Sequence, residues 1–232
     1  MATALEPAAL ASISLFEGLN EEQLRTVAGC IHRRVFPAGT GVITADTPGE
    51  VVYIVQSGTV KIKVDQADGG EVIIAILGEG EIVGELSVLD SAGRSADVLT
   101  LEESALLWID RVSFDRLIAT LPPLTHNLLR LLSRRVRLST EQIQALCTLD
   151  VLGKVARQLV VFADRYGQPV DDGVLIPLRL TQSDIACLVG ASRERVNQVF
   201  VNLRNRKLLS VDGTYRITLT DPAKLREIVR QR

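Results

Sequence analysis

The hydrophobic pattern of the chain changes at Pro122-Pro123, and this change constrains the fold more than any other feature of the sequence. Between Val35 and Ile109, short runs rich in Val and Ile alternate with glycines, a pattern typical of short antiparallel strands in a sandwich or barrel. After the two prolines, apolar residues recur at intervals of three and four, which predicts a long amphipathic helix. The chain is therefore expected to be α+β.

The predicted helix carries its apolar residues on one narrow stripe. The stripe consists of Leu129, Leu132, Val136, Ser139, Ile143 and Leu146. A helix of about 24 residues with such a seam needs a partner helix, and two copies of the chain related by a two-fold axis would supply one. Packing of the stripe onto the rest of its own chain remains an alternative. Ser139 is the only polar residue on the stripe.

The segment 181–205 has the pattern of a helix-turn-helix. Thr181 to Asp184 form a capping box that opens a first helix, and Gly190 permits the positive φ of the turn. Ser192 then caps a second helix, Arg193 to Asn205. The hairpin at Asp212-Gly213 predicts a wing. The candidate DNA-binding residues are Thr181, Gln182, Ser192, Arg193, Glu194, Asn197 and Gln198.

The chemistry of the second helix fits base recognition, because Arg can bind guanine, Glu can accept from cytosine, and Asn or Gln suits adenine. The distribution of charge along the chain also favours nucleic-acid binding by the C-terminal part. Residues 1–149 contain 12 basic and 19 acidic side chains, whereas residues 150–232 contain 14 basic and 9 acidic side chains. Only the C-terminal part is therefore expected to bind a polyanion.

A second candidate site lies between Gly84 and Ala96. Glu85 and Arg94 stand nine residues apart beside a glycine, where they could enclose a sugar-phosphate. The carboxylate would accept from a ribose hydroxyl, and the guanidinium would bind phosphate oxygens together with backbone N–H groups at the turn. A salt bridge between Glu85 and Arg94 on a surface loop is the alternative.

These motifs together resemble the cAMP receptor protein/FNR superfamily of bacterial transcription regulators, from about Leu15 to Leu219. The resemblance implies that Glu85 binds the ribose 2′-hydroxyl and that Arg94 and Ser95 hold the cyclic phosphate. It also implies that Ser139 and Thr140 contact the purine, one from each subunit. The candidate ligand-binding residues are Gly84, Glu85, Leu86, Ser87, Arg94, Ser95, Ser139 and Thr140.

The expected architecture has three parts. Residues 1–121 form a double-stranded β-helix (jelly roll) that binds a cyclic nucleotide, residues 122–148 a dimerisation helix, and residues 149–232 a winged helix-turn-helix. The expected effector is cAMP, with cGMP, cyclic di-GMP or no ligand as alternatives. The expected partners are double-stranded DNA at palindromic promoter sites, a second copy of the chain, and RNA polymerase. Gln198 replaces an arginine that reads guanine in cAMP receptors, so a different half-site is expected.

Several classes of protein are disfavoured. Cys30, Cys147 and Cys187 are too far apart for a disulfide framework or a CxxC metal pair, and two histidines give no zinc site. The sequence contains no evident pair of a catalytic nucleophile and a base, so an enzyme is not expected. A thiol-based redox sensor using Cys30 or Cys147 remains an alternative. No apolar run approaches the ~18 residues of a membrane span, and no signal peptide is evident, so a cytoplasmic protein is expected.

Overall fold

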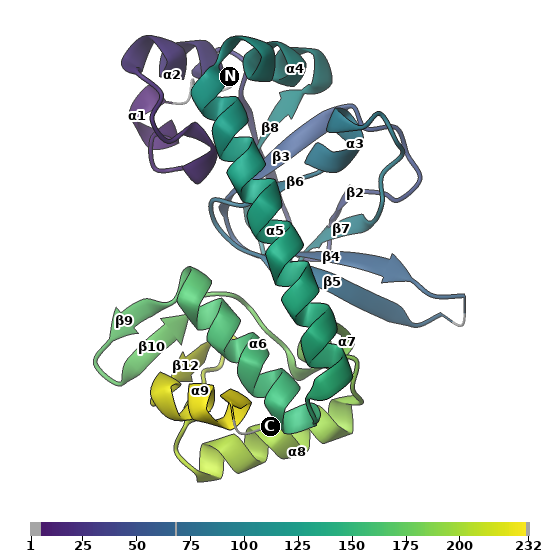
Figure 1. The fold of residues 1–232 in the computed structure, drawn as a ribbon, viewed down its shortest axis with the longest axis vertical. Helices are drawn as coiled ribbons and strands as arrows, with labels where there is room; N and C mark the ends of the chain where they lie inside the picture. Colours follow the sequence, from purple (N-terminus) through teal and green to yellow (C-terminus); the bar gives the residue numbers. More distant parts are fainter. Residues whose placement is uncertain (1–5, 68, 231–232) are drawn as a thin grey trace. The chain divides into compact units, whose positions relative to one another are not determined.

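The computed structural model describes residues 6–67 and 69–230 (Figure 1). Contact density divides the chain into two units, one formed by Met1–Val64 with Ile76–Leu138 and the other by Asp65–Ala75 with Ser139–Arg232. Each unit has its own hydrophobic core. The helix α5 (Pro122–Thr148) is continuous and belongs in part to each unit.

The first unit is built on two antiparallel four-stranded sheets, with strand orders β1-β8-β3-β6 and β2-β7-β4-β5. The strands are β1 (His32–Phe36), β2 (Gly41–Ile43), β3 (Val51–Ser57), β4 (Val60–Asp65), β5 (Glu71–Leu77), β6 (Ile82–Val83), β7 (Asp97–Thr100) and β8 (Ser104–Asp110). The pairing of β3 with β8 places Tyr53 opposite Trp108. The predicted antiparallel β domain is confirmed.

Short helices complete this unit. They are α1 (Pro7–Leu10), a 3-10 turn (Ser14–Phe16), α2 (Glu21–Ala28), α3 (Glu85–Leu89) and α4 (Arg111–Thr120). Phe16, Phe114 and Leu124 are almost completely buried in one core cluster with residues of β3 and β8. The first turns of α5 are therefore anchored in the core of the β domain, because burial of each such side chain contributes roughly 1.5–3 kcal/mol.

The second unit contains the predicted winged helix-turn-helix. Its elements are α6 (Val151–Tyr166), β9 (Gln168–Val170), β10 (Gly173–Ile176), α7 (Gln182–Val189), α8 (Arg193–Asn205), β11 (Leu209–Val211), β12 (Ile217–Leu219) and α9 (Pro222–Arg230). Thr181 caps α7 through a capping box, Gly190 has φ +63°, and Ser192 caps α8. The sequence predicted both caps, the turn glycine and the limits of α8 correctly.

The wing formed by β11 and β12 differs in one detail from the sequence pattern. Tyr215, and not Gly213, has the left-handed conformation, with φ +65°. The Asp212 carboxylate accepts from the backbone N–H groups of Thr214 at 2.8 Å and Arg216 at 2.9 Å, and these bonds lower its pKa. The aspartate side chain therefore holds the turn in place, a role that Asp commonly has.

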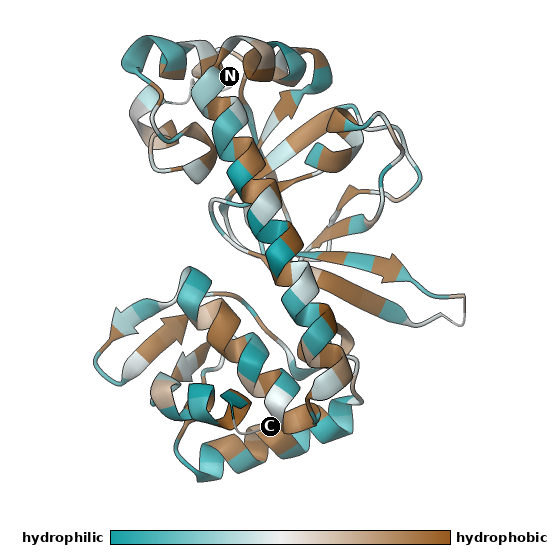
Figure 2. Ribbon diagram, viewed as in Figure 1, coloured by the Kyte–Doolittle hydropathy of each residue, from teal (hydrophilic) through white to brown (hydrophobic). Residues whose placement is uncertain are grey.

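The apolar stripe of α5 is largely open to solvent in the single chain. Leu129, Val136 and Ile143 are 58%, 66% and 63% exposed, whereas Leu124 and Leu128 on another face of the helix are buried. Figure 2 shows apolar and polar residues alternating around this helix. Leu132, also on the stripe, is partly buried against the core of the first unit. The exposure of Leu129, Val136 and Ile143 disfavours the alternative in which the whole stripe packs onto its own chain. Among the described residues, no helix is long and apolar enough to cross a membrane.

The N-cap of α4 gives the first testable prediction. Asp110 accepts from the backbone N–H of Ser113 at 2.9 Å, and this hydrogen bond lowers the Asp110 pKa. We expect Asp110→Ala to lower the free energy of unfolding by about 1 kcal/mol at pH 7. Because a lowered pKa stabilises the fold only above the unfolded value near 3.8, the difference should shrink as the pH falls toward and below that value.

Urea denaturation followed by fluorescence of Trp108, the only tryptophan in the chain, measures this effect. Asp110→Asn is the control, because Asn also caps helices but does not titrate. It should stay close to wild type at pH 7. An equal loss in both variants would show that the cap hydrogen bond is not the cause.

Candidate functional site

The candidate ligand site is organised around Gly84, which links β6 to α3. Gly84 has φ +80°, and a Cβ atom there would lie 2.5 Å from Nη1 of Arg94. Gly49 is equally constrained, because a Cβ atom would lie 2.5 Å from Oγ of Ser87 on α3. Glycine at both positions allows backbone and side chains to approach closely. The loop between β2 and β3 therefore packs directly against α3.

Arg94 is the central cation of this site, and it is buried, with 6% of its surface exposed. Its Nη1 donates to the Gly84 carbonyl at 2.6 Å and to Oγ of Ser87 at 2.8 Å, and its Nη2 donates to the Val51 carbonyl at 2.6 Å. All three acceptors are neutral. Burial lowers the pKa of Arg94, and attraction to Tyr53, Glu50 and Glu85 opposes this effect. The guanidinium is thus fixed but not neutralised by direct contact.

Glu85 is also buried, with 2% of its surface exposed, and its partner is Arg135 on α5. Arg135 donates through Nη1 to Oε1 of Glu85 at 2.6 Å, and through Nη2 to the Ile82 carbonyl and to Oε2 of Glu81 at 3.4 Å. This guanidinium joins α5 to the strand and helix that carry the candidate site. Arg135 and Glu85 are held in a partly buried network. Breaking an ion pair of this kind lowers the stability of a protein more than breaking one at the surface does.

The structure brings four of the predicted ligand residues together, namely Gly84, Glu85, Ser87 and Arg94. The side chain of Leu86 is 49% exposed and Ser95 is exposed. Within the part of the chain that the structure describes, no ion pair joins Glu85 to Arg94, so the alternative of a simple surface salt bridge is wrong. Ser139 and Thr140 are exposed on α5, and their contact with a purine stays a prediction.

Arg135 is the residue that sequence reasoning missed. It lies beside the apolar stripe of α5, fifty residues after Glu85, and nothing in that spacing relates the two. The sequence showed only that Arg135 is a basic residue beside the apolar stripe, which does not indicate a partner for it. Long-range pairs of this kind are revealed only by the fold.

The candidate DNA-binding surface is the outer side of α8. Arg193, Glu194, Asn197 and Gln198 are exposed there, while Val196 and Phe200 on the other side are buried. The hydroxyls of Thr181 and Ser192 are used as helix caps, and Gln182 is half-buried. These three are accordingly placed at helix starts, where backbone contacts to a phosphate are common.

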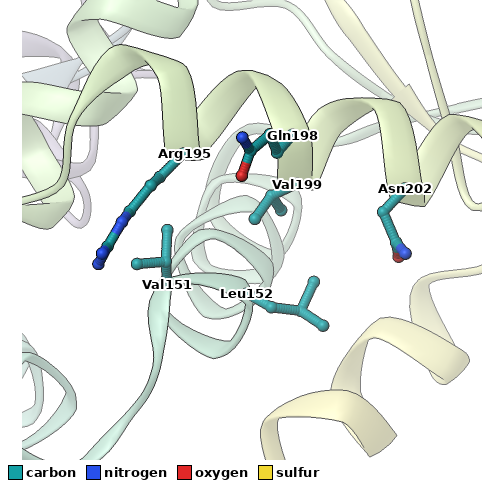
Figure 3. Close-up of a pocket in the computed structure, with 6 residues that line it drawn as sticks. All are labelled: Val151, Leu152, Arg195, Gln198, Val199 and Asn202. Carbon is teal, nitrogen blue, oxygen red and sulfur yellow. The ribbon is translucent and has the colours of Figure 1, made fainter.

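Gln198 also lines a groove of about 310 Å³ between α8 and the start of α6. Figure 3 shows Arg195, Gln198, Val199 and Asn202 reaching from α8 toward Val151 and Leu152. Arg195 and Asn202 line this groove together with Gln198. Their spacing from Gln198, three residues before and four after, places all three on one side of the helix.

None of the three cysteines forms a disulfide within the described residues. Cys147 is exposed, Cys30 and Cys187 are half-buried, and Nη2 of Arg116 lies 3.4 Å from the Cys30 sulfur. Among the described residues, no group of three or more His, Cys, Asp or Glu side chains is placed to hold a metal ion.

Comparisons with known proteins match the two parts of the chain in which the candidate sites lie. The cyclic nucleotide-binding domain family matches residues 33–121, and the Crp-like helix-turn-helix domain family matches residues 153–228. A CRP-like cAMP-activated global transcriptional regulator of Mycobacterium tuberculosis is 34% identical over 88% of this chain and 91% of its own length. The cyclic AMP receptor protein of Thermus thermophilus is 32% identical over 92% of this chain and 95% of its own.

A solved structure extends the comparison to a different effector. The c-di-GMP responsive global regulator CLP of Xanthomonas campestris aligns with a TM-score of 0.69 and 26% identity. The alignment covers 86% of this chain and 99% of that protein. Relatives of the same architecture are thus described as responding to different nucleotides.

The buried ion pair gives the second testable prediction. Replacing Arg135 by Met leaves the Glu85 carboxylate buried without its cation, so the free energy of unfolding should fall by about 3 kcal/mol. The double variant Arg135→Met/Glu85→Gln removes the charge as well and should recover much of that loss. Urea denaturation followed by Trp108 fluorescence measures both. A single variant that loses less than about 1 kcal/mol contradicts a stabilising role for the pair.

Proposed function

Because the chain belongs to the cAMP receptor protein/FNR superfamily of transcription regulators and carries its cyclic nucleotide-binding and DNA-binding domains, we propose that cAMP activates it to bind palindromic promoter sites as a homodimer. The curated relatives it matches are transcription regulators. The protein is a regulator, not an enzyme.

The observation that carries this proposal is that Arg94 is buried and bonded only to neutral acceptors among the described residues. Its guanidinium is buried and oriented by neutral acceptors, and a guanidinium has more N–H donors than these three hydrogen bonds use. A cyclic phosphate would supply the missing negative charge and accept from the remaining donors. The residues present therefore fit an anionic sugar-phosphate. The nearby Glu85 carboxylate would accept a hydrogen bond from the ribose.

Arg135 supports a route from this site to α5. A ribose hydroxyl that binds Glu85 must share the carboxylate with Arg135, because Oε1 already accepts from that guanidinium. Binding of the effector therefore acts directly on a residue of α5. Ser139 follows Arg135 by one helical turn, on the neighbouring surface of the helix, where contact with the purine is proposed.

The exposed stripe of α5 supports the homodimer. Two copies would bury Leu129, Val136 and Ile143 against their symmetry mates, which removes an apolar surface from water. In such a dimer the two α8 helices would read half-sites about 34 Å apart, one turn of DNA. We place this activity in the bacterial cytoplasm, with RNA polymerase as the further partner of a promoter-bound regulator.

The identity of the nucleotide is the least constrained part of the proposal. Both curated relatives compared above are described as cAMP proteins, whereas the solved structure from Xanthomonas is described as responsive to c-di-GMP. The Arg94 and Glu85 contacts recognise ribose and phosphate, which all of these nucleotides contain. We therefore favour cAMP on the stronger sequence similarity, with cyclic di-GMP as the second candidate.

The third prediction tests the ligand site by titration calorimetry with cAMP, cGMP and cyclic di-GMP. We expect Arg94→Leu to weaken binding of the effector on the order of 100-fold, because charge-assisted hydrogen bonds contribute roughly 1.5–3 kcal/mol each. Arg25→Leu is the control, since Arg25 is an exposed arginine on α2 that pairs only with Glu21 among the described residues. It should bind as wild type does. Unchanged affinity in Arg94→Leu would place the nucleotide elsewhere.

The fourth prediction concerns α8. Arg193→Ala should reduce the preference for the specific site over random DNA about tenfold, since a bidentate base contact is worth roughly 1–3 kcal/mol of discrimination. Fluorescence anisotropy with both DNAs, at one fixed salt concentration, measures the ratio. The control is Arg226→Ala on α9, whose guanidinium pairs with Asp164. An equal decrease on both DNAs in Arg193→Ala would indicate a phosphate contact instead of base recognition.

A further inference from the structure

In the last third of α5, the side chain of Gln142 is hydrogen-bonded to the helix-turn-helix. Its Nε2 donates to the Leu188 carbonyl on α7 at 3.2 Å, and its Oε1 accepts from Nη1 of Arg157 on α6 at 2.8 Å. Both ends of the carboxamide are therefore used. Gln142, half-buried, is a direct link among α5, α6 and α7 within the second unit.

The Leu188 carbonyl is available to accept a hydrogen bond from Gln142 because of its position in α7. It belongs to the last turn of α7, where carbonyl groups have no intrahelical donor. The N–H groups of Gly190 and Ala191 both return to Ala186, so they leave the Leu188 carbonyl to another donor. Gln142 thus caps the first helix of the motif two residues before the turn glycine that orients α8.

Arg157 fixes the side chain of Gln142. Its second nitrogen, Nη2, binds Oε2 of Glu141 at 3.2 Å, so the fork of the guanidinium spans two adjacent residues of α5. The Arg157 side chain is only 14% exposed. Ala145, one turn after Gln142, is buried as well. This cluster of Gln142, Arg157 and Glu141 with the Leu188 carbonyl is called the α5 clamp below.

We propose that Gln142 is a positioning residue of the DNA-binding switch. The α5 clamp makes the last turns of α5 and the first helix of the helix-turn-helix move as one body, so that a rotation of α5 reorients α8. This inference rests on the proposed function, because the clamp acts as part of a switch only if the nucleotide acts on α5. Gln142 itself contacts neither nucleotide nor DNA in this role.

The test compares three variants by the ratio of DNA affinities with and without saturating cAMP. Gln142→Ala removes both hydrogen bonds, and Gln142→Glu keeps an acceptor for Arg157 but cannot donate to the Leu188 carbonyl. Gln144→Ala is the control, because Gln144 is an exposed glutamine on the same helix. We expect both Gln142 variants to lower the ratio on the order of fivefold, the scale of one hydrogen bond, and the control to leave it unchanged.

A second readout needs no nucleotide. Hydrogen exchange of the ligand-free chain should be faster at the turn around Gly190 in both Gln142 variants, with no change in Gln144→Ala. Thermal unfolding of each variant separates positioning from stability. A Gln142→Ala protein that melts earlier but keeps the wild-type affinity ratio has lost only a structural contact, and this result overturns the inference. Unchanged exchange at Gly190 overturns it too.

The two proposals fail in different ways. If the DNA affinity of the wild-type chain does not respond to cAMP, cGMP or cyclic di-GMP, the proposed function is wrong and Gln142 has no part in a nucleotide switch. The exchange measurement still reports whether Gln142 holds α7. If the wild type responds and the Gln142 variants respond equally, only the inference about the α5 clamp is wrong.

Discussion

A buried guanidinium that no carboxylate contacts directly is the constraint on which the ligand site depends. Arg94 lies inside the β domain, held by two backbone carbonyls and the Ser87 hydroxyl. Burying a cation is costly unless opposite charge is near, and here that charge comes only from a distance, from groups such as Glu50 and Glu85. Glycine at position 84 lets the Arg94 guanidinium lie against the backbone, and glycine at position 49 lets the neighbouring loop lie against Ser87. This arrangement supports the proposed binding of an anionic sugar-phosphate.

The helix α5 connects this site to the rest of the chain through two polar residues. Arg135 binds the buried Glu85 in the first unit, and Gln142 binds the end of α7 in the second. The two are seven residues apart, or two turns, and so share one side of α5. The exposed apolar residues Leu129, Val136 and Ile143 lie on a separate stripe. The apolar stripe proposed to meet a second copy is thus distinct from the side of the helix that carries Arg135 and Gln142.

Local features of this protein were predictable from the sequence, and long-range features were not. The limits of α8, its cap at Ser192 and the turn at Gly190 followed from residue types at fixed spacing, because caps and turns depend on neighbours only a few residues away. Glu85 and Arg94 were also chosen within one short segment, and their contacts with a nucleotide stay a prediction. The partner of Glu85 was not predictable, since Arg135 is fifty residues away in the sequence. The hydrogen bond from Gln142 to the Leu188 carbonyl, which spans 46 residues, was not predictable either. At the wing, the Asp212-Gly213 pattern predicted a hairpin, but it did not show that Tyr215 has the left-handed conformation.

The most direct measurement of the central claim is a crystal structure of the full chain with cAMP. The account predicts phosphate oxygens of the nucleotide at hydrogen-bond distance, about 2.7–2.9 Å, from the Arg94 guanidinium, and a ribose hydroxyl on the Glu85 carboxylate. Nucleotide bound at another place, with Arg94 still bonded only to Gly84, Ser87 and Val51, would contradict it.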